Sequence, residues 1–194
     1  MIALGAVLAA AGTGCERDGD SAAPPPARFN AATTDPQNQR SLAELCTAQN
    51  PGPFSPPALA AGALPEVKGW QWINVWATWC VPCVEEIPLI MRWEKRLRSD
   101  GSPVSLVFVS ADDNGQVVAA FRTEHTAMPD GPRLADPGDL GAWVKSLGLP
   151  SAVSIPIHVF VRPDGQVACA RAGALSTADY PLIRRLIRSS GKSP

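Results

Sequence analysis

The sequence lacks a strong net charge and an extended basic surface. Its 17 Lys and Arg residues nearly balance its 18 Asp and Glu residues, which leaves a formal net charge of −1. The one cluster of Lys or Arg, within Ile183–Arg188, places its charges between apolar residues at helical spacing, which is typical of a solvent-exposed helix face. We therefore expect neither a nucleic-acid partner nor a basic membrane-binding face.

The sequence also lacks, near its N-terminus, an apolar run long enough to cross a bilayer as a helix. The run Ile2–Ala11 has ten residues, about half the length that a membrane span needs. Small residues and Cys15 follow it at the edge of a polar segment. This order resembles a bacterial lipoprotein signal, in which the cysteine receives the lipid. No Lys or Arg precedes the run and Gly12 stands where Leu is usual, so a cleaved signal peptide without lipid and a non-specific apolar tail stay open.

Composition divides the chain into three parts. After the expected leader, residues 1–15, the segment 16–41 is rich in Pro, Ala and polar residues and has too few large apolar residues to fold. As a flexible coil this segment would reach roughly 25–30 Å and act as a linker. Residues 42–190 carry the apolar patterns of a folded domain, and 45% of the whole chain is apolar, enough for a core.

Strands and helices alternate in the pattern of apolar residues. Pro88 should kink the first long helix, and Ser176 and Asp179 should form a capping box for the last one. Because strands joined by helices pair in parallel and a final hairpin adds antiparallel strands, we expect an α/β fold with a central mixed sheet flanked by helices, after an N-terminal extension. The expected elements are a strand at Trp70–Trp76, a helix at Cys80–Arg98, a strand at Pro103–Ser110, helices at Ala111–His125 and Asp139–Leu149, a hairpin within Ile155–Gly173 and a helix at Ser176–Ser190.

Two cysteines, Cys80 and Cys83, stand where the first of these strands meets the first helix. Cys80 would lie at the helix N-terminus, where free backbone N–H groups and the helix dipole stabilise a thiolate. Cys83 lies one turn further on the same side and can close a small disulfide with it. This predicts a redox pair, in which one thiolate attacks a partner's disulfide and the other resolves the mixed disulfide. Trp79 and Pro82 are expected to limit water access and to stiffen the loop.

A zinc site would need two further ligands, and the sequence has no second C-x-x-C. Zinc is therefore disfavoured, and we expect neither a metal nor a cofactor. A purely structural disulfide between Cys80 and Cys83 is also disfavoured. Closing so short a loop removes little conformational entropy from the unfolded chain and therefore stabilises the fold little. The other candidate ligands are lone residues of separate segments: Cys46, His125, His158 and Cys169.

The segment Ile73–Pro88, INVWATWCVPCVEEIP, resembles the active-site segment of the membrane-tethered extracytoplasmic thioredoxins, the TlpA, ResA and CcmG-like group of the thioredoxin superfamily. The resemblance covers about residues 54–187 and is also good over Val104–Asn114 and the final hairpin and helix. It implies a thioredoxin fold and thiol–disulfide exchange outside the cytoplasm, with Cys80 as the nucleophile and Cys83 as the resolving cysteine. The matching positions are Asn74, Trp76, Ala77, Trp79, Cys80, Cys83 and Pro88.

The resemblance also implies supporting residues around the pair. The family's cis-proline, which faces the disulfide, corresponds to Pro156, and a cis bond would point the backbone of Ile155 at the sulfurs, where a partner chain can pair with it. An ordinary trans proline that opens a strand is the alternative. The segment Gly148–Pro156 is longer than the family's usual pattern, which leaves partner specificity open. Val81 and Pro82, between the cysteines, influence the reduction potential.

Asn74 stands where ordinary thioredoxins have a buried Asp that assists proton transfer to the resolving cysteine. Asn cannot titrate, so this role passes to water or to another carboxylate. Glu86 is three residues beyond Cys83 and could share its helix face, but a solvent-exposed helix position is the favoured interpretation. His125 is expected at an exposed helix end, and for His158, on a strand near the cis-proline, a role near the site is the less favoured interpretation.

Two cysteines remain, Cys46 and Cys169. Outside the cytoplasm such leftover thiols commonly pair, and a structural Cys46–Cys169 disulfide would pin the N-terminal segment to the sheet edge. The alternative is two separate buried thiols.

Together these features predict a periplasmic, membrane-anchored thiol–disulfide oxidoreductase that reduces partner proteins, with cytochrome c maturation as one use. Its expected partners are proteins with disulfides or thiols, a membrane thiol reductase that supplies electrons, and the bilayer through a lipid on Cys15. A copper-binding protein stays open, and would need a His aligned with the pair, for which His158 is the candidate. A thiol peroxidase of the redoxin group fits less well, because it needs Thr three residues before its cysteine and Thr78 is two residues before Cys80.

Overall fold

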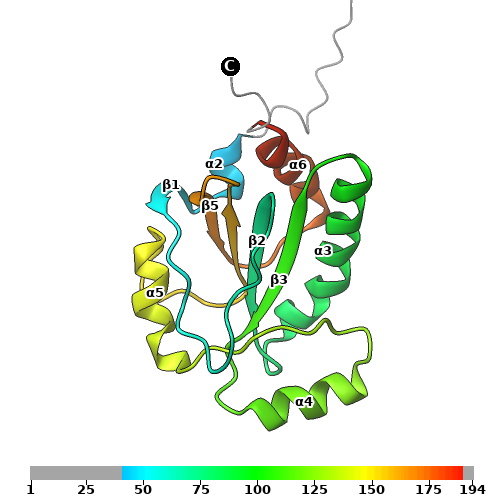
Figure 1. The fold of residues 1–194 in the computed structure, drawn as a ribbon, viewed down its shortest axis with the longest axis vertical. Helices are drawn as coiled ribbons and strands as arrows, with labels where there is room; N and C mark the ends of the chain where they lie inside the picture. Colours follow the sequence, from blue (N-terminus) through cyan, green and yellow to red (C-terminus); the bar gives the residue numbers. More distant parts are fainter. Residues whose placement is uncertain (1–40, 190–194) are drawn as a thin grey trace, which may run out of the picture. The chain divides into compact units, whose positions relative to one another are not determined.

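A computed structural model describes residues 41–189 of the chain (Figure 1). The expected leader, Cys15 and nearly all of the expected linker lie outside these residues. The elements, in chain order, are α2 (Leu42–Leu45), β1 (Ala48–Pro53), β2 (Trp70–Trp76), α3 (Val81–Ser99), β3 (Val104–Ser110), α4 (Gly115–Glu124), η1 (Pro137–Asp139), α5 (Leu140–Ser146), β4 (Ile157–Val161), β5 (Gln166–Ala172), η2 (Thr177–Asp179) and α6 (Tyr180–Ser189).

The five strands form one mixed sheet in the order β1-β5-β4-β2-β3. β2 pairs in parallel with β3, and α3 connects these two strands. β4 pairs antiparallel with both β2 and β5, and β5 pairs antiparallel with β1. This arrangement confirms the predicted fold class, because the helix-connected strands are parallel and the final hairpin adds antiparallel ones.

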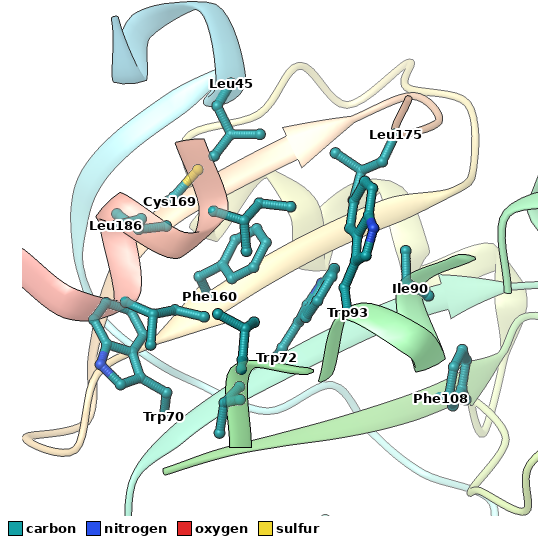
Figure 2. Packing of buried hydrophobic residues seen from close by; sticks show 14 of the residues in the cluster. Leu45, Trp70, Trp72, Ile90, Trp93, Phe108, Phe160, Cys169, Leu175 and Leu186 are labelled. Atoms are coloured by element: carbon teal, nitrogen blue, oxygen red, sulfur yellow. The ribbon is translucent and has the colours of Figure 1, made fainter. Parts of the chain in front are cut away.

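All seven residues of β2 are buried, because side chains cover both faces of the sheet. Trp72 and Trp76 point to one face, where they pack with Phe160 of β4 and with residues of α3 and α6. Ile73 and Val75 point to the other face and pack with residues of α5. The rings of Trp72 and Phe160 lie side by side on the face covered by α3 and α6, with 4.9 Å between their centroids (Figure 2). Burial on both faces fixes the position of the end of β2, where the loop that leads to Cys80 begins.

Local sequence explains where α3 begins. Cys80 is its N-cap, and Pro82 lies in the first turn. Backbone N–H groups in the first turn have no partner within the helix, so a proline there costs no helical hydrogen bond. Residues at helical spacing, Cys83, Ile90 and Leu97 among them, are buried against the sheet. Pro88 lies inside the helix on its exposed side. The helix differs from the expected one by a single residue at each end.

The segment Ala111–His125 was expected to open with cap-type residues and to continue as a helix. The helix α4 begins at Gly115, directly after such a residue. Asn114 is the N-cap, and its side chain accepts a hydrogen bond from the backbone N–H of Gln116 at 2.8 Å. The residues before it are outside the helix because Asp112 turns toward the active-site loop, as described below.

The other two expected helices are shorter. The 3-10 turn η2 takes the place of the first expected turn of α6, whereas α5 mainly ends earlier, at Ser146, with Leu147 as its C-cap. The capping box of Ser176 and Asp179 is present, but it begins η2 rather than α6. Two short elements, α2 and β1, were not expected as a helix and a strand. Within residues 41–189, no helix is both long enough and apolar enough to cross a membrane.

Candidate active site at the start of α3

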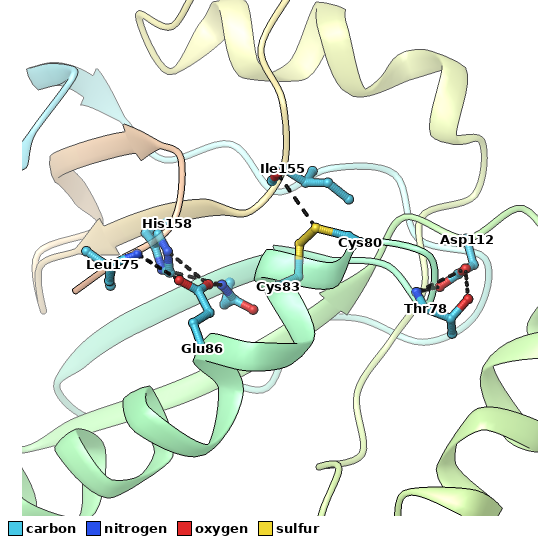
Figure 3. The surroundings of a disulfide bond; sticks show 9 residues. Thr78, Cys80, Cys83, Glu86, Asp112, Ile155, His158 and Leu175 are labelled. Atoms are coloured by element: carbon cyan, nitrogen blue, oxygen red, sulfur yellow. Dashed lines mark hydrogen bonds and ion pairs between the residues drawn. A yellow bond between two sulfur atoms is a disulfide. The ribbon is translucent and has the colours of Figure 1, made fainter. Parts of the chain in front are cut away.

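Cys80 and Cys83 form a disulfide at the N-terminal end of α3 (Figure 3). β2 ends at Trp76, three loop residues follow, and Cys80 caps the helix, so the sheet and the helix fix the pair from both sides. The exposed fraction is 5% for Cys80 and zero for Cys83. Cys80 therefore has the remaining contact with solvent, while Cys83 lies behind it against the core.

The backbone of Ile155 lies opposite this disulfide. The Ile155–Pro156 peptide bond is cis, and the carbonyl oxygen of Ile155 is 3.7 Å from Sγ of Cys80 (Figure 3). This is the place that the resemblance implied for both residues. A disulfide sulfur carries no hydrogen, but a Cys80 thiol at this distance could donate to that carbonyl.

Three apolar residues next to or between the two cysteines are exposed. Trp79 is 68% exposed and Val81 is 66% exposed, and Pro82 is exposed as well. The expectation that Trp79 and Pro82 limit water access stays a prediction, although both side chains are exposed. An exposed apolar surface beside a reactive bond is suited to contact with another molecule.

A buried carboxylate anchors the loop that precedes the cysteines. Asp112 accepts hydrogen bonds from the backbone N–H of Thr78 at 3.1 Å and from its hydroxyl at 2.7 Å. The hydroxyl of Ser110, at the end of β3, donates to the same carboxylate at 2.8 Å. This anchor was not predicted from the sequence. The signal was that Thr78 follows β2 as Asp112 follows β3, and that the ends of parallel neighbours meet at one edge of a sheet.

Glu86 is buried, with an exposed fraction of 4%, and the predicted solvent-exposed position is wrong. Oε1 accepts a hydrogen bond from the side-chain amide of Asn74 at 2.9 Å, and Oε2 accepts one from the backbone N–H of Leu175 at 2.8 Å. Nε2 of His158 lies 3.2 Å from Oε1 (Figure 3). The helical spacing of Cys83 and Glu86 places both on the buried face of α3, one turn apart.

The two histidines occupy different environments. His125 is exposed at the C-terminal end of α4, as expected, and its ring stacks on Phe121. His158 is completely buried on β4, beside Asn74 of β2. The structure therefore brings His158 to the site, contrary to the favoured interpretation of the sequence.

Cys46 and Cys169 are joined by a second disulfide, with 5.3 Å between their Cα atoms. Cys46 directly follows α2, and Cys169 lies in β5, the strand that pairs with β1. The bridge thus attaches the start of the described chain to the sheet. Within residues 41–189, no three side chains of His, Cys, Asp or Glu are grouped as metal ligands.

Curated proteins similar to this chain include a thiol-disulfide oxidoreductase and a thioredoxin-like protein. The thiol-disulfide oxidoreductase ResA of Oceanobacillus iheyensis is 31% identical over 104 residues, which is 54% of this chain and 50% of ResA. The thioredoxin-like protein YneN of Bacillus subtilis is 35% identical over 60 residues, 30% of this chain and 35% of YneN. The chain thus spans half or less of the curated relatives that it matches. No protein-family model matches it.

Solved structures match over a larger part of the chain. The thioredoxin domain of a thiol-disulfide oxidoreductase from Bacteroides vulgatus gives a TM-score of 0.50 at 16% identity, over 69% of this chain and 99% of that one. A DsbE-type thiol:disulfide interchange protein from Chlorobium tepidum gives 0.50 at 18% identity, over 71% and 98%. The chain therefore has a thioredoxin fold. Within that class it is similar to ResA, which confirms the resemblance inferred from the sequence.

Proposed function

We propose that this protein is a thiol–disulfide oxidoreductase with Cys80 as the nucleophile. The observation that carries the proposal is a disulfide at the N-terminus of α3, opposite the cis bond of Pro156 and flanked by exposed apolar side chains. A thiolate at a helix N-terminus is stabilised by free N–H groups and by the helix dipole. The similarity to ResA supports the same chemistry.

The reaction begins with the reduced pair. The Cys80 thiolate attacks one sulfur of the partner's disulfide, a mixed disulfide forms, and the partner's other sulfur leaves as a thiolate. Cys83 then loses its proton and attacks the Cys80 sulfur. The mixed disulfide breaks, the second partner sulfur leaves, and the Cys80–Cys83 disulfide forms. Two electrons pass to the partner, and its two thiolates take up protons.

Cys83 needs a base for the second step, because it is buried and water reaches it poorly. Asn74, at the position of the usual Asp, has no titrating group. The Glu86 carboxylate lies one turn along α3 on the same buried face and accepts a hydrogen bond from Asn74. We assign to Glu86 the role of accepting the Cys83 proton.

The partner's backbone would pair with that of Ile155, and its side chains would contact Trp79 and Val81. Both side chains are exposed and apolar, and such contacts suit an extended peptide on either side of a disulfide. Val81 and Pro82 adjust the reduction potential from within the pair.

We place this reaction outside the cytoplasm, in the direction of partner reduction. The Cys46–Cys169 disulfide supports that compartment, because a structural disulfide persists where the surroundings are oxidising. A membrane thiol reductase would return electrons to the Cys80–Cys83 disulfide. A lipid on Cys15 would keep the domain at the membrane, and cytochrome c maturation is the process that the resemblance suggests.

A trapping experiment tests the proposal. Replacing Cys83 by Ala removes the resolving thiol, so the reduced variant should accumulate a mixed disulfide with insulin, seen as a shifted band that disappears with dithiothreitol. Cys80→Ala is the matched control and should trap nothing. The wild-type chain should also catalyse insulin reduction by dithiothreitol at least tenfold over the uncatalysed rate. No catalysis, together with Cu(I) held stoichiometrically against a chelator, would establish the copper-binding alternative instead.

A further inference from the structure

A buried polar cluster lies behind Cys83, and His158 is at its centre. Nδ1 of His158 is 3.3 Å from the indole nitrogen of Trp72 and 3.4 Å from the side-chain amide nitrogen of Asn74. Nε2, on the opposite edge of the ring, is 3.2 Å from Oε1 of Glu86. The ring thus spans the space between β2 and the buried face of α3.

These neighbours determine which ring nitrogen carries the hydrogen. The indole N–H of Trp72 can only donate, so Nδ1 of His158 must accept and its lone pair must face the indole. The hydrogen of the neutral ring is then on Nε2, on the side of Glu86. A hydrogen on Nδ1 would point at the hydrogen of the indole, so the Nδ1–H tautomer is disfavoured.

Among the charged groups of residues 41–189 near the His158 ring, Glu86 is the one that contacts it. Arg171 of β5 is the register partner of His158, but its guanidinium donates to the carbonyl oxygens of Leu45 and Ala174 and lies 4.0 Å from Asp179. β2 contributes only the uncharged Trp72 and Asn74 to the contacts of the ring, and α3 contributes Glu86, with the Cys83 thiol of the reduced protein one turn away.

We infer that His158 is a positioning residue of the reaction, which holds the Glu86 carboxylate behind Cys83 through its Nε2–H group. The inference rests on the proposed function. Within residues 41–189, Nε2 has no aligned hydrogen-bond partner in this disulfide form, although Oε1 is at 3.2 Å. A rotation of the carboxylate or of the ring would be needed to align the two groups. The contact between His158 and Glu86 cannot be predicted from the C-x-x-C motif, because it joins a residue of β4 to a residue of α3.

The two half-reactions separate this role from a general structural one. His158 acts through Glu86 on the proton of Cys83, so it should affect the resolving step. It should not affect the first step, in which Cys80 attacks, because Cys80 is at the opposite, solvent side of the pair.

Single-turnover kinetics with a peptide disulfide test the inference. His158→Leu should slow resolution about tenfold and shift its pH profile to higher pH, because Cys83 then loses its proton without a held carboxylate. Mixed-disulfide formation, measured in Cys83→Ala, should change less than twofold when His158→Leu is added. His158→Gln should restore most of the resolution rate, because its amide offers a donor to Glu86 and an acceptor to Trp72. His125→Leu, at the exposed histidine, is the matched control and should match wild type.

Nitrogen NMR gives a second test, which leaves His158 unchanged. The sequence has two histidines, so the two rings can be assigned with the His125→Leu variant, and the ¹⁵N shifts should show the Nε2–H tautomer for His158 at neutral pH. An Nδ1–H tautomer, or a wild-type resolution rate in His158→Leu, would overturn the inference while catalysis by the wild-type chain stands. A wild-type chain that exchanges no disulfides would instead refute the proposed function.

Discussion

The Cys46–Cys169 disulfide should contribute more to the stability of this domain than any other single contact in it. The bridge closes a loop with a sequence separation of 123 residues, against 3 for the Cys80–Cys83 pair. Both cysteines of the bridge are buried, so the disulfide connects two packed parts of the folded domain. The bridge therefore restricts most of the unfolded domain, while the redox pair restricts one turn.

Loop-closure entropy gives the expected magnitude. For a loop of this length the chain-entropy relation predicts about 5 kcal/mol at 25 °C, and for the short redox loop about 2 kcal/mol. Measured values often fall below the relation, so we expect a loss of about 3–5 kcal/mol on opening the long loop. With a urea m-value of about 2 kcal/mol per molar, the unfolding midpoint should fall by roughly 2 M.

The cleanest assay changes no residue between its two arms. In a chain with Cys15, Cys80 and Cys83 replaced by Ser, only Cys46 and Cys169 can pair. Urea unfolding of this variant, followed by circular dichroism with and without dithiothreitol, compares the open and closed bridge in one sequence. The urea m-value should rise on reduction, because the unfolded chain becomes more expanded.

The reasoning would be refuted by a difference below about 1 kcal/mol between these two arms. Such a result would mean that the unfolded chain is already compact between Cys46 and Cys169. Alternatively, opening the bridge would increase the conformational entropy of the folded state as much as that of the unfolded state. A second comparison, Cys46→Ala with Cys169→Ala in the otherwise wild-type chain, should lower stability by a similar amount and leave insulin reduction within twofold. A parallel loss of activity would place the bridge in the catalytic machinery.

Two further predictions concern the loop before the cysteines. Asp112→Ala leaves the N–H and hydroxyl of Thr78 without their acceptor, so it should cost about 2–3 kcal/mol in urea unfolding and slow insulin reduction, whereas Asp112→Asn keeps one acceptor oxygen and should cost less. An Asp112→Ala variant as stable as wild type would show that the anchor is not needed. Trp79→Ala removes a side chain that is 68% exposed, so stability should stay within about 0.5 kcal/mol while kcat/KM falls severalfold for insulin but not for a small aromatic disulfide. Equal losses for both substrates would contradict the role of Trp79 in contacting the partner.

The features that the sequence predicted well depend on local signals. The strand β2 is a two-sided apolar run, and α3 begins where a cap position, a first-turn proline and an apolar stripe agree. Those two elements already place Cys80 and Cys83 at a helix N-terminus. By contrast, α2 and β1 are too short to show a period, and β1 contains two prolines and a glycine.

The features that the sequence did not predict depend on contacts between distant segments. The burial of Glu86 results from the backbone N–H of Leu175, 89 residues away, and from His158 on another strand. Helical spacing shows that Glu86 shares a face with Cys83, but it does not show that donors from β2, β4 and the loop after β5 meet that face. An acidic residue at such a position is ordinarily solvated, so the local interpretation favoured the wrong environment.

The two faces of α3 explain how a single helix separates the two steps of the exchange. Cys80, the N-cap, contacts the carbonyl oxygen of Ile155 and has exposed Trp79 and Val81 as its chain neighbours, so a partner disulfide would meet this sulfur first. Cys83 is one turn on and completely buried, on the face that also carries Glu86. A change on the solvent side should therefore alter partner choice and the rate of attack. A change in the buried cluster should alter the resolving step and its pH dependence, and with it the lifetime of the mixed disulfide.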